Sequence, residues 1–290
     1  MKGFSLLELL LALAITLMIG MIGFQLFRQN ERTFETQNSV SSVQQNARAV
    51  IFQINDDIRR AGQGVPVYAA TFDSTPTEPV AAILDGSDTT HLHIRDGYSN
   101  VQAEVLTAPA NYVLNTTKTV SVSDSSSFYN TLSTSSPSGR FVYVWGSGSN
   151  SCWSWIRAAL VSLSVAAKTI TLVPQQIGQA CRITNDTVQL ASSAIIALEE
   201  AASIYLNNGS IWRATAADMT SQTNPIWNAA AEIGRDFDDL NFTYYDANNN
   251  MIQPTTLTAR LAVVRIDTKI HAQSGLGLTV RSYPVNLRLH

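Results

Sequence analysis

The feature that most restricts this chain is an uninterrupted apolar run at its N-terminus. Residues Phe4 to Phe27 contain a single charged side chain, Glu8. As a helix, these 24 residues would extend for roughly 36 Å at about 1.5 Å per residue, enough to cross a hydrocarbon core of about 30 Å. The run predicts a transmembrane segment over residues 4–27. No second run of this length occurs in the sequence, which excludes a multi-span membrane protein.

Two ordinary explanations of the run fit it poorly. A cleaved secretory signal peptide would place its A-x-A site at Ala12 and Ala14, but the apolar stretch continues well past that point. A plain signal anchor leaves Glu8 unexplained, because a carboxylate within a membrane helix costs a few kcal/mol and indicates a function. Basic residues lie on both sides of the run, so they do not set its orientation.

The residues around Glu8 carry a more specific pattern. The segment GFSLLE, from Gly3 to Glu8, follows a very short basic leader and precedes the unbroken apolar helix. In this it resembles the signal of the type IV prepilin family. The resemblance implies that prepilin peptidase cuts between Gly3 and Phe4, that Phe4 is then N-methylated, and that Glu8 docks against a neighbouring subunit. There it would neutralise the Phe4 amine, because a buried charge is tolerated only with a partner.

An amphipathic stretch prolongs the predicted helix beyond the apolar run. From Asn30 to Ala61 the apolar residues recur in steps of three and four, which is typical of a helix packed along one face. Acidic residues precede basic ones at the end of this stretch, and Gly62 and Pro66 favour termination there. The apolar stripe consists of Phe34, Val40, Val43, Ala47, Val50, Ile51, Ile54 and Ile58.

The residues at the end of this helix indicate which class of pilin the chain resembles most. Residues 45–48, QNAR, and 57–62, DIRRAG, are similar to the runs that PilW-type minor pilins carry there. J-type pseudopilins of type II secretion share the long helix and the β-rich domain but usually lack the Arg-Ala-Gly ending. The resemblance implies a minor pilin, a structural subunit that helps to initiate assembly of a type IV pilus. A J-type pseudopilin of a type II secretion pseudopilus and a pilus-borne adhesin are the alternatives.

The resemblance also implies partners and a location. The precursor would be a single-pass protein of the inner membrane with a periplasmic globular domain, and would later enter an extracellular pilus. Its partners would be other minor and major pilins, prepilin peptidase and the inner-membrane assembly machinery. No nucleic-acid partner is expected, because only 14% of the residues are charged and phosphate binding needs concentrated positive charge.

After Gly62 the sequence changes to short alternating segments that predict antiparallel strands. Residues 62–290 are therefore expected to form one β-rich globular domain, and the whole chain an α+β, pilin-like fold. Within it, Ile226–Phe237 suggests a short helix, Thr116–Ser138 a Ser/Thr-rich surface loop, and Asn207–Gly209 a tight hairpin turn. The expected organisation is a leader peptide at 1–3, a long helix at 4–61, and the globular domain at 62–290. Strands are expected at 90–94, 101–106, 119–122, 141–145, 154–161, 169–173, 194–206, 210–212, 240–245, 261–270 and 279–289.

The two cysteines of the chain, Cys152 and Cys181, are expected to form a disulfide. The periplasm and the cell exterior are oxidising, and thiols there pair readily. Two buried free thiols are the alternative. The cysteines have no CxxC spacing, so they do not predict a zinc site.

Enzyme and metal signatures are missing from the sequence. It contains no GxSxG, HExxH, GxxxxGK[ST] or GxGxxG motif, so we expect a protein with no catalytic residues, cofactor or metal. His91 and His93 share one strand face, but two histidines without a third placed ligand are typical of surface residues. The segment Asp246–Asn250 imitates the start of a calcium loop, yet Met251 stands where that loop needs glycine, so a hairpin turn is expected.

Overall fold

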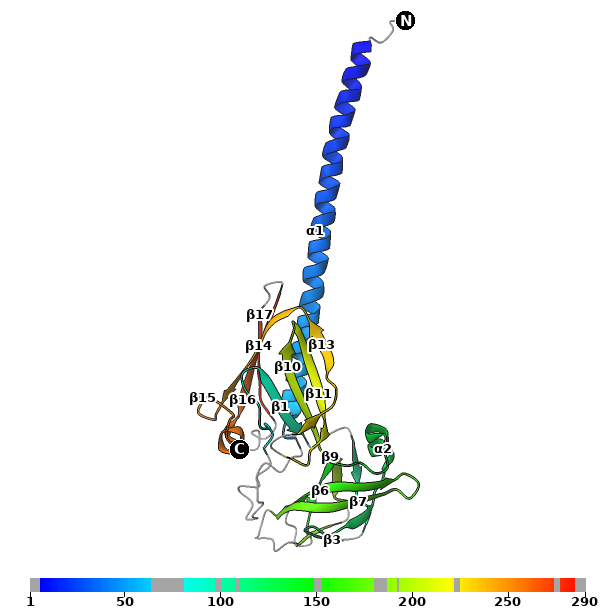
Figure 1. Cartoon of the computed structure of the whole chain (residues 1–290), viewed down its shortest axis with the longest axis vertical. Coiled ribbons are helices and arrows are strands. Elements are labelled where there is room, and N and C mark those ends of the chain that lie inside the picture. Colours follow the sequence, from blue (N-terminus) through cyan, green and yellow to red (C-terminus); the bar gives the residue numbers. More distant parts are fainter. Residues whose placement is uncertain are drawn as a thin grey trace. The chain divides into compact units, whose positions relative to one another are not determined.

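One long helix precedes a series of antiparallel strands in the computed structural model (Figure 1). The α+β class expected from the sequence is thereby confirmed. The chain divides into two compact units, Met1–Arg48 and Ala49–His290. The structure describes residues 6–63, 81–96, 101–107, 110–148, 153–179, 187–191, 193–221, 225–273 and 277–284.

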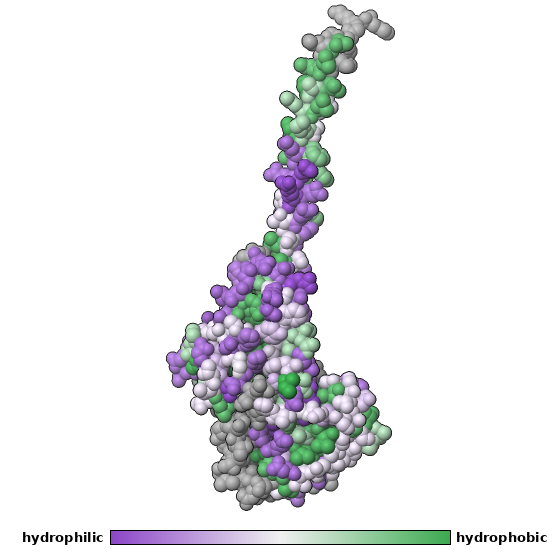
Figure 2. Space-filling view, in the orientation of Figure 1, coloured by the Kyte–Doolittle hydropathy of each residue, from purple (hydrophilic) through white to green (hydrophobic). Residues whose placement is uncertain are grey.

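Helix α1 runs from Leu6 to Arg60 and supplies all of the described part of the first unit. Its large apolar side chains there have no covering partner: those described from Leu6 to Phe34 are each more than half exposed. Figure 2 shows the upper part of this stretch as mostly hydrophobic and its lower end as hydrophilic. In the part of the chain that the structure describes, no helix combines the length and the apolar character needed to cross a membrane.

The last turns of α1 belong to the second unit and are packed there. The four apolar residues of the predicted stripe that lie in this unit are all buried, which confirms the second half of the stripe. Gly62 then adopts a φ of +78°, a left-handed conformation that glycine takes without strain, and this conformation ends the helix. The buried stripe residues of this unit are Val50, Ile51, Ile54 and Ile58.

Two antiparallel sheets contact this end of the helix. The first, here called the anchor sheet, has the strand order β1-β10-β11-β12, with β13 also paired to β11. The second, the C-terminal sheet, has the order β15-β14-β16-β17, and Ser282 at its edge donates a hydrogen bond to Asn55 of α1 (2.5 Å). The anchor sheet comprises β1 (His91–Asp96), β10 (Glu200–Asn207), β11 (Ser210–Asp218), β12 (Ile226–Trp227) and β13 (Ala231–Arg235). The C-terminal sheet comprises β14 (Phe237–Tyr245), β15 (Met251–Ile252), β16 (Arg265–Ala272) and β17 (Gly277–Ser282).

A third sheet, called the middle sheet because its strands come from the middle of the sequence, holds a hydrophobic cluster of buried residues. Its strand order is β2-β9-β5-β6-β7-β4, and the short pair β3-β8 accompanies it. The middle sheet comprises β2 (Gln102–Glu104), β4 (Lys118–Ser121), β5 (Phe141–Ser147), β6 (Trp153–Ser164), β7 (Thr169–Gln179) and β9 (Ile195–Leu198). The accompanying pair is β3 (Ala110–Val113) and β8 (Thr187–Leu190).

Two of the predicted elements are wrong. Residues 194–206, expected as one strand, form β9 and β10, which lie in different sheets and are separated by Glu199. The segment Ile226–Phe237, expected as a short helix, contains β12 and β13, which both pair with β11. Cross-strand pairing with a long neighbouring strand has overridden the helical spacing of its apolar residues.

Two short helices were also missed. Helix α2 (Ser126–Leu132) lies inside the segment predicted as a Ser/Thr-rich loop and is held by the fully buried Phe128. Helix α3 (Leu257–Ala262) overlaps the start of the strand predicted at 261–270, and its cap residue Thr256 accepts a hydrogen bond from the Ala259 N–H (3.2 Å). The predicted hairpin turn is confirmed, since Asn208 and Gly209 both have positive φ between β10 and β11.

Candidate functional site

The residues predicted for processing, docking and disulfide formation lie outside the part of the chain that the structure describes. Gly3 and Phe4 precede the first described residue, Leu6, and the side chain of Glu8 is not among the described side chains. Cys152 and Cys181 fall in two of the gaps between described ranges. The cleavage site, the docking carboxylate and the disulfide therefore stay predictions.

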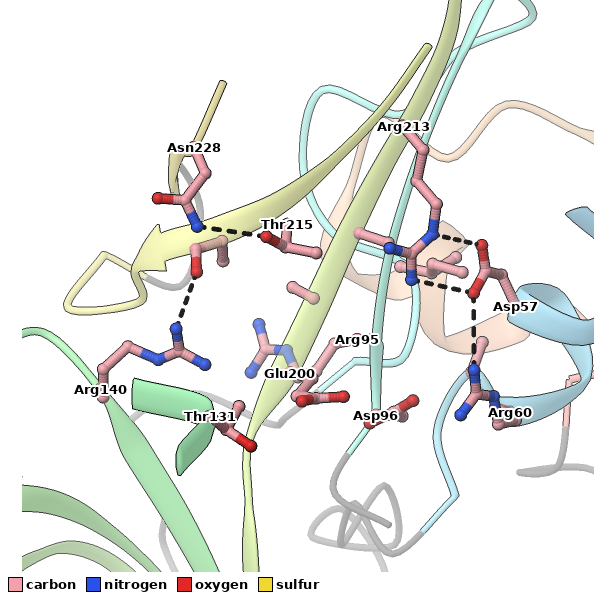
Figure 3. A pocket seen from close by; sticks show the side chains of 15 residues that line it. Asp57, Arg60, Arg95, Asp96, Thr131, Arg140, Glu200, Arg213, Thr215 and Asn228 are labelled. Carbon is pink, nitrogen blue, oxygen red and sulfur yellow. Dashed lines mark hydrogen bonds and ion pairs between the residues drawn. The ribbon is translucent and has the colours of Figure 1, made fainter. Parts of the chain in front are cut away.

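The described structure instead explains the DIRRAG motif at the end of α1. Asp57 is buried and accepts two hydrogen bonds from Arg213 of β11, at 2.8 Å from Nε and 3.1 Å from Nη2 (Figure 3). A two-point guanidinium–carboxylate pair fixes orientation as well as distance. The hydrogen bonds to Asp57, opposed by burial, raise the pKa of Arg213. This pair anchors the helix end to the anchor sheet.

Four further residues of the motif complete this anchor, while Arg59 is exposed. Ile58 and Ala61 are buried within the second unit. Arg60 forms ion pairs with Asp56 at 3.3 Å and with Asp57 at 3.9 Å. The N–H of Gly62 donates to the carbonyl of Arg95 in β1 (2.7 Å), so the residue that ends the helix also ties it to the sheet.

A polar cavity of about 280 Å³ lies beside the anchor (Figure 3). Asp96 of β1 and Glu200 of β10 line it and are direct cross-strand partners. Burial, and next the neighbouring Glu200, raise the pKa of Asp96 to about 7. Burial also raises the pKa of Glu200, against the opposing effect of Arg140. The walls come from the end of α1, from β1, β10 and β11, and from Thr131, Arg140 and Asn228.

A fully buried charge cluster joins the middle sheet to the anchor sheet. Glu199, at the point where the chain leaves β9 for β10, accepts a hydrogen bond from Arg157 Nε of β6 (2.7 Å). Its other oxygen lies 3.3 Å from Arg95 Nη1 of β1. The Arg157 guanidinium also stacks over the ring of Phe141 (3.8 Å) and donates to the carbonyl of Met219 (3.1 Å). One carboxylate thus connects strands from two sheets.

The two histidines on β1 belong to a stack of rings. His91 stacks on Tyr205 at 5.6 Å between ring centroids, His93 stacks on Trp227 at 5.1 Å, and the two imidazoles are 6.2 Å apart. Burial, with a smaller contribution from His91, lowers the pKa of His93 to about 4, so its ring is neutral at pH 7. Among the residues that the structure describes, no three potential metal ligands gather in one place.

The calcium-like segment is a hairpin turn, as predicted. Asp246 Oδ1 accepts the backbone N–H groups of Asn248 (2.9 Å) and Asn250 (2.8 Å), which closes the turn between β14 and β15. These hydrogen bonds lower the pKa of Asp246. The carboxylate is therefore occupied by the turn.

Replacing Arg213 with alanine is expected to lower the free energy of unfolding by about 1–3 kcal/mol, because the Asp57 carboxylate would stay buried without its two hydrogen bonds. Urea unfolding of the full chain in detergent, followed by tryptophan fluorescence, measures this loss. The control is Arg281→Ala, which removes an exposed arginine 3.8 Å from Asp267 and is expected to change stability by less than about 0.5 kcal/mol. Equal losses in the two variants would show that the pair does not anchor the helix.

Comparison with known proteins gives no relative for this chain, since no family model, curated protein or solved structure matches it. A functional assignment therefore depends on the residues themselves.

Proposed function

We propose that this chain is a minor pilin, a structural subunit that helps to initiate assembly of a type IV pilus. The observation that carries the proposal is the segment from Gly3 to Glu8, which places a small residue, a phenylalanine and a lone carboxylate in register ahead of an apolar run. After cleavage, the Phe4 amine and the Glu8 carboxylate of neighbouring subunits would neutralise each other in the filament core. An apolar interior makes such pairing necessary, because an unpaired charge is expensive there.

The exposed apolar surface of α1 supports this proposal. Leaving apolar surface in water is unfavourable by about 25 cal/mol per Å², and a large continuous apolar surface indicates an interaction site. In the proposal, lipid of the inner membrane covers this surface in the precursor, and the helices of other minor and major pilins cover it in the pilus. The globular domain would be periplasmic first and extracellular later.

The anchor at the end of α1 favours a minor pilin over a J-type pseudopilin. The Arg-Ala-Gly ending is the part of the resemblance that separates the two classes, and here Ala61 is buried and Gly62 bonds to β1. Arg60, Ala61 and Gly62 each have a packing or bonding partner, so the ending that carries the resemblance also has a structural role in this chain.

Processing of the leader provides the direct test. Gly3→Leu is expected to abolish removal of residues 1–3, because the peptidase implied by the resemblance must accept a small residue beside the bond that it cuts. Intact-mass spectrometry of membrane and filament fractions should find wild-type protein that starts at N-methylated Phe4 and variant protein that retains Met1. Ser5→Ala, on the other side of the cut, is the control and should be processed normally. A wild-type protein in filaments that retains Met1 would exclude the proposal.

A further inference from the structure

Two sets of carboxylates face the same arginines at the end of α1. On the helix side, Asp57 holds both hydrogen bonds of Arg213 and the more distant ion pair of Arg60. On the sheet side, Asp96 and Glu200 stand directly opposite each other on β1 and β10. Within the described residues neither of these two has an ion-pair partner within 4.0 Å, and Asp96 Oδ1 is buried without a hydrogen bond.

Both arginines are close enough to interact electrostatically with the two carboxylates of the sheet, Asp96 and Glu200. Arg60 and Arg213 each act on Asp96 and on Glu200 by favouring the charged form of the acid. The cavity of about 280 Å³ lined by all four side chains leaves room for a guanidinium to turn (Figure 3). Arg140, also in the cavity wall, is less available, because it donates to the carbonyls of Ala216 (3.0 Å) and Glu199 (3.5 Å).

We propose that Asp96 and Glu200 form a pH-sensitive release for the helix anchor. When both are ionised, they compete with Asp57 for Arg213 and Arg60 and loosen the end of α1. When they are protonated, Asp57 keeps both arginines and the helix end is held firmly. Two like charges directly opposite each other on neighbouring strands are destabilising, so the ionised pair gains from drawing a cation toward it. The charged groups that face the pair are Asp57 and Arg60 of α1, Arg95 of β1, Arg213 of β11, and Arg140.

The direction of the pH effect follows from the folded and unfolded protonation states. An unfolded aspartate ionises near its usual pKa of 3.8, whereas in the fold the pKa of Asp96 is about 7. Between these two values the native state binds a proton that the unfolded state releases, so stability falls as the pH rises through this window. The anchor should be tighter in mild acid than in mild alkali. This inference does not depend on the pilus assignment.

Hydrogen–deuterium exchange of the full chain in detergent tests the release. Peptides that cover residues 49–63 report on the helix end, and peptides from β7, distant in sequence and in the middle sheet, serve as an internal reference. After correction for intrinsic exchange rates, protection of the helix end should be about tenfold lower at about pH 8 than at about pH 5.5, the factor that corresponds to one pKa unit. The reference peptides should change by less than about twofold.

Variants separate the release from other pH effects. The double variant Asp96→Asn, Glu200→Gln should keep the helix end protected at both pH values, while Glu104→Gln, an exposed acid of β2, should retain the wild-type response. The proposal would be overturned by any of three results. The wild type could show the same protection at both pH values, the double variant could respond to pH as the wild type does, or the helix end of the double variant could be weakly protected at both pH values. The wild-type result decides even where the double variant does not fold.

Discussion

Replacing Glu199 with alanine is expected to lower the free energy of unfolding by about 3–5 kcal/mol, the typical effect of breaking a buried ion pair. The substitution would leave two guanidinium groups, 2% exposed in Arg95 and 1% in Arg157, without their carboxylate. Burial opposes the charge on Arg157, but Glu199 and Tyr143 outweigh it and raise the pKa of this arginine. Without Glu199, the strongest contribution that offsets burial of the Arg157 charge is lost, so the charged form of Arg157 becomes costly in this interior.

Urea unfolding of the full chain in detergent measures this loss, and an exposed pair in the anchor sheet provides the control. Glu232→Ala breaks the ion pair with Arg235, which is of similar length (2.8 Å) and whose arginine is 71% exposed. This substitution should cost less than about 0.5 kcal/mol. Glu199→Gln should fall between the two, because its amide oxygen can still accept from Arg157. A Glu199→Ala protein as stable as the control would mean that the cluster does not hold the two sheets together.

Glu8→Leu is expected to reduce incorporation into pili strongly while expression, cleavage and the fold of residues 62–290 stay intact. Under the proposed function, this substitution leaves the Phe4 amine of a neighbouring subunit unpaired in an apolar environment, and breaking such a pair typically costs about 3–5 kcal/mol. The globular domain should be unaffected, because its buried contacts with α1 begin far from Glu8 in sequence.

Surface pili and cross-links to other minor pilins, compared between wild type and Glu8→Leu, measure this effect. Glu31→Leu is the matched control, since it makes the same exchange on the polar stretch of α1 beyond the apolar run. A subunit at the very tip has no subunit ahead of it, so its Glu8 matters less than that of a repeating subunit. Normal piliation together with normal cross-links would show that Glu8 is not the docking residue.

Local patterns in the sequence predicted the features that depend on neighbouring residues. The buried stripe of α1 follows from the 3.6-residue period of a helix, and the turn at Asn208 and Gly209 follows from residues that adopt positive φ easily. The turn closed by Asp246 is local in the same way, because an aspartate side chain can bond to backbone groups a few residues ahead. In these cases the sequence determines the structure over one or two turns of the chain.

Features that join distant segments were beyond this kind of inference. DIRRAG could be recognised as a motif, but its partner Arg213 lies 156 positions beyond Asp57. Glu199 looked like a mid-strand residue within 194–206, whereas it is the carboxylate that connects two sheets. Likewise, the spacing of apolar residues in 226–237 predicted a helix, whereas this segment forms two strands, which pair with β11. Periodicity records which face of a segment is apolar, but the partner of a strand or a charge depends on which distant residues folding brings beside it.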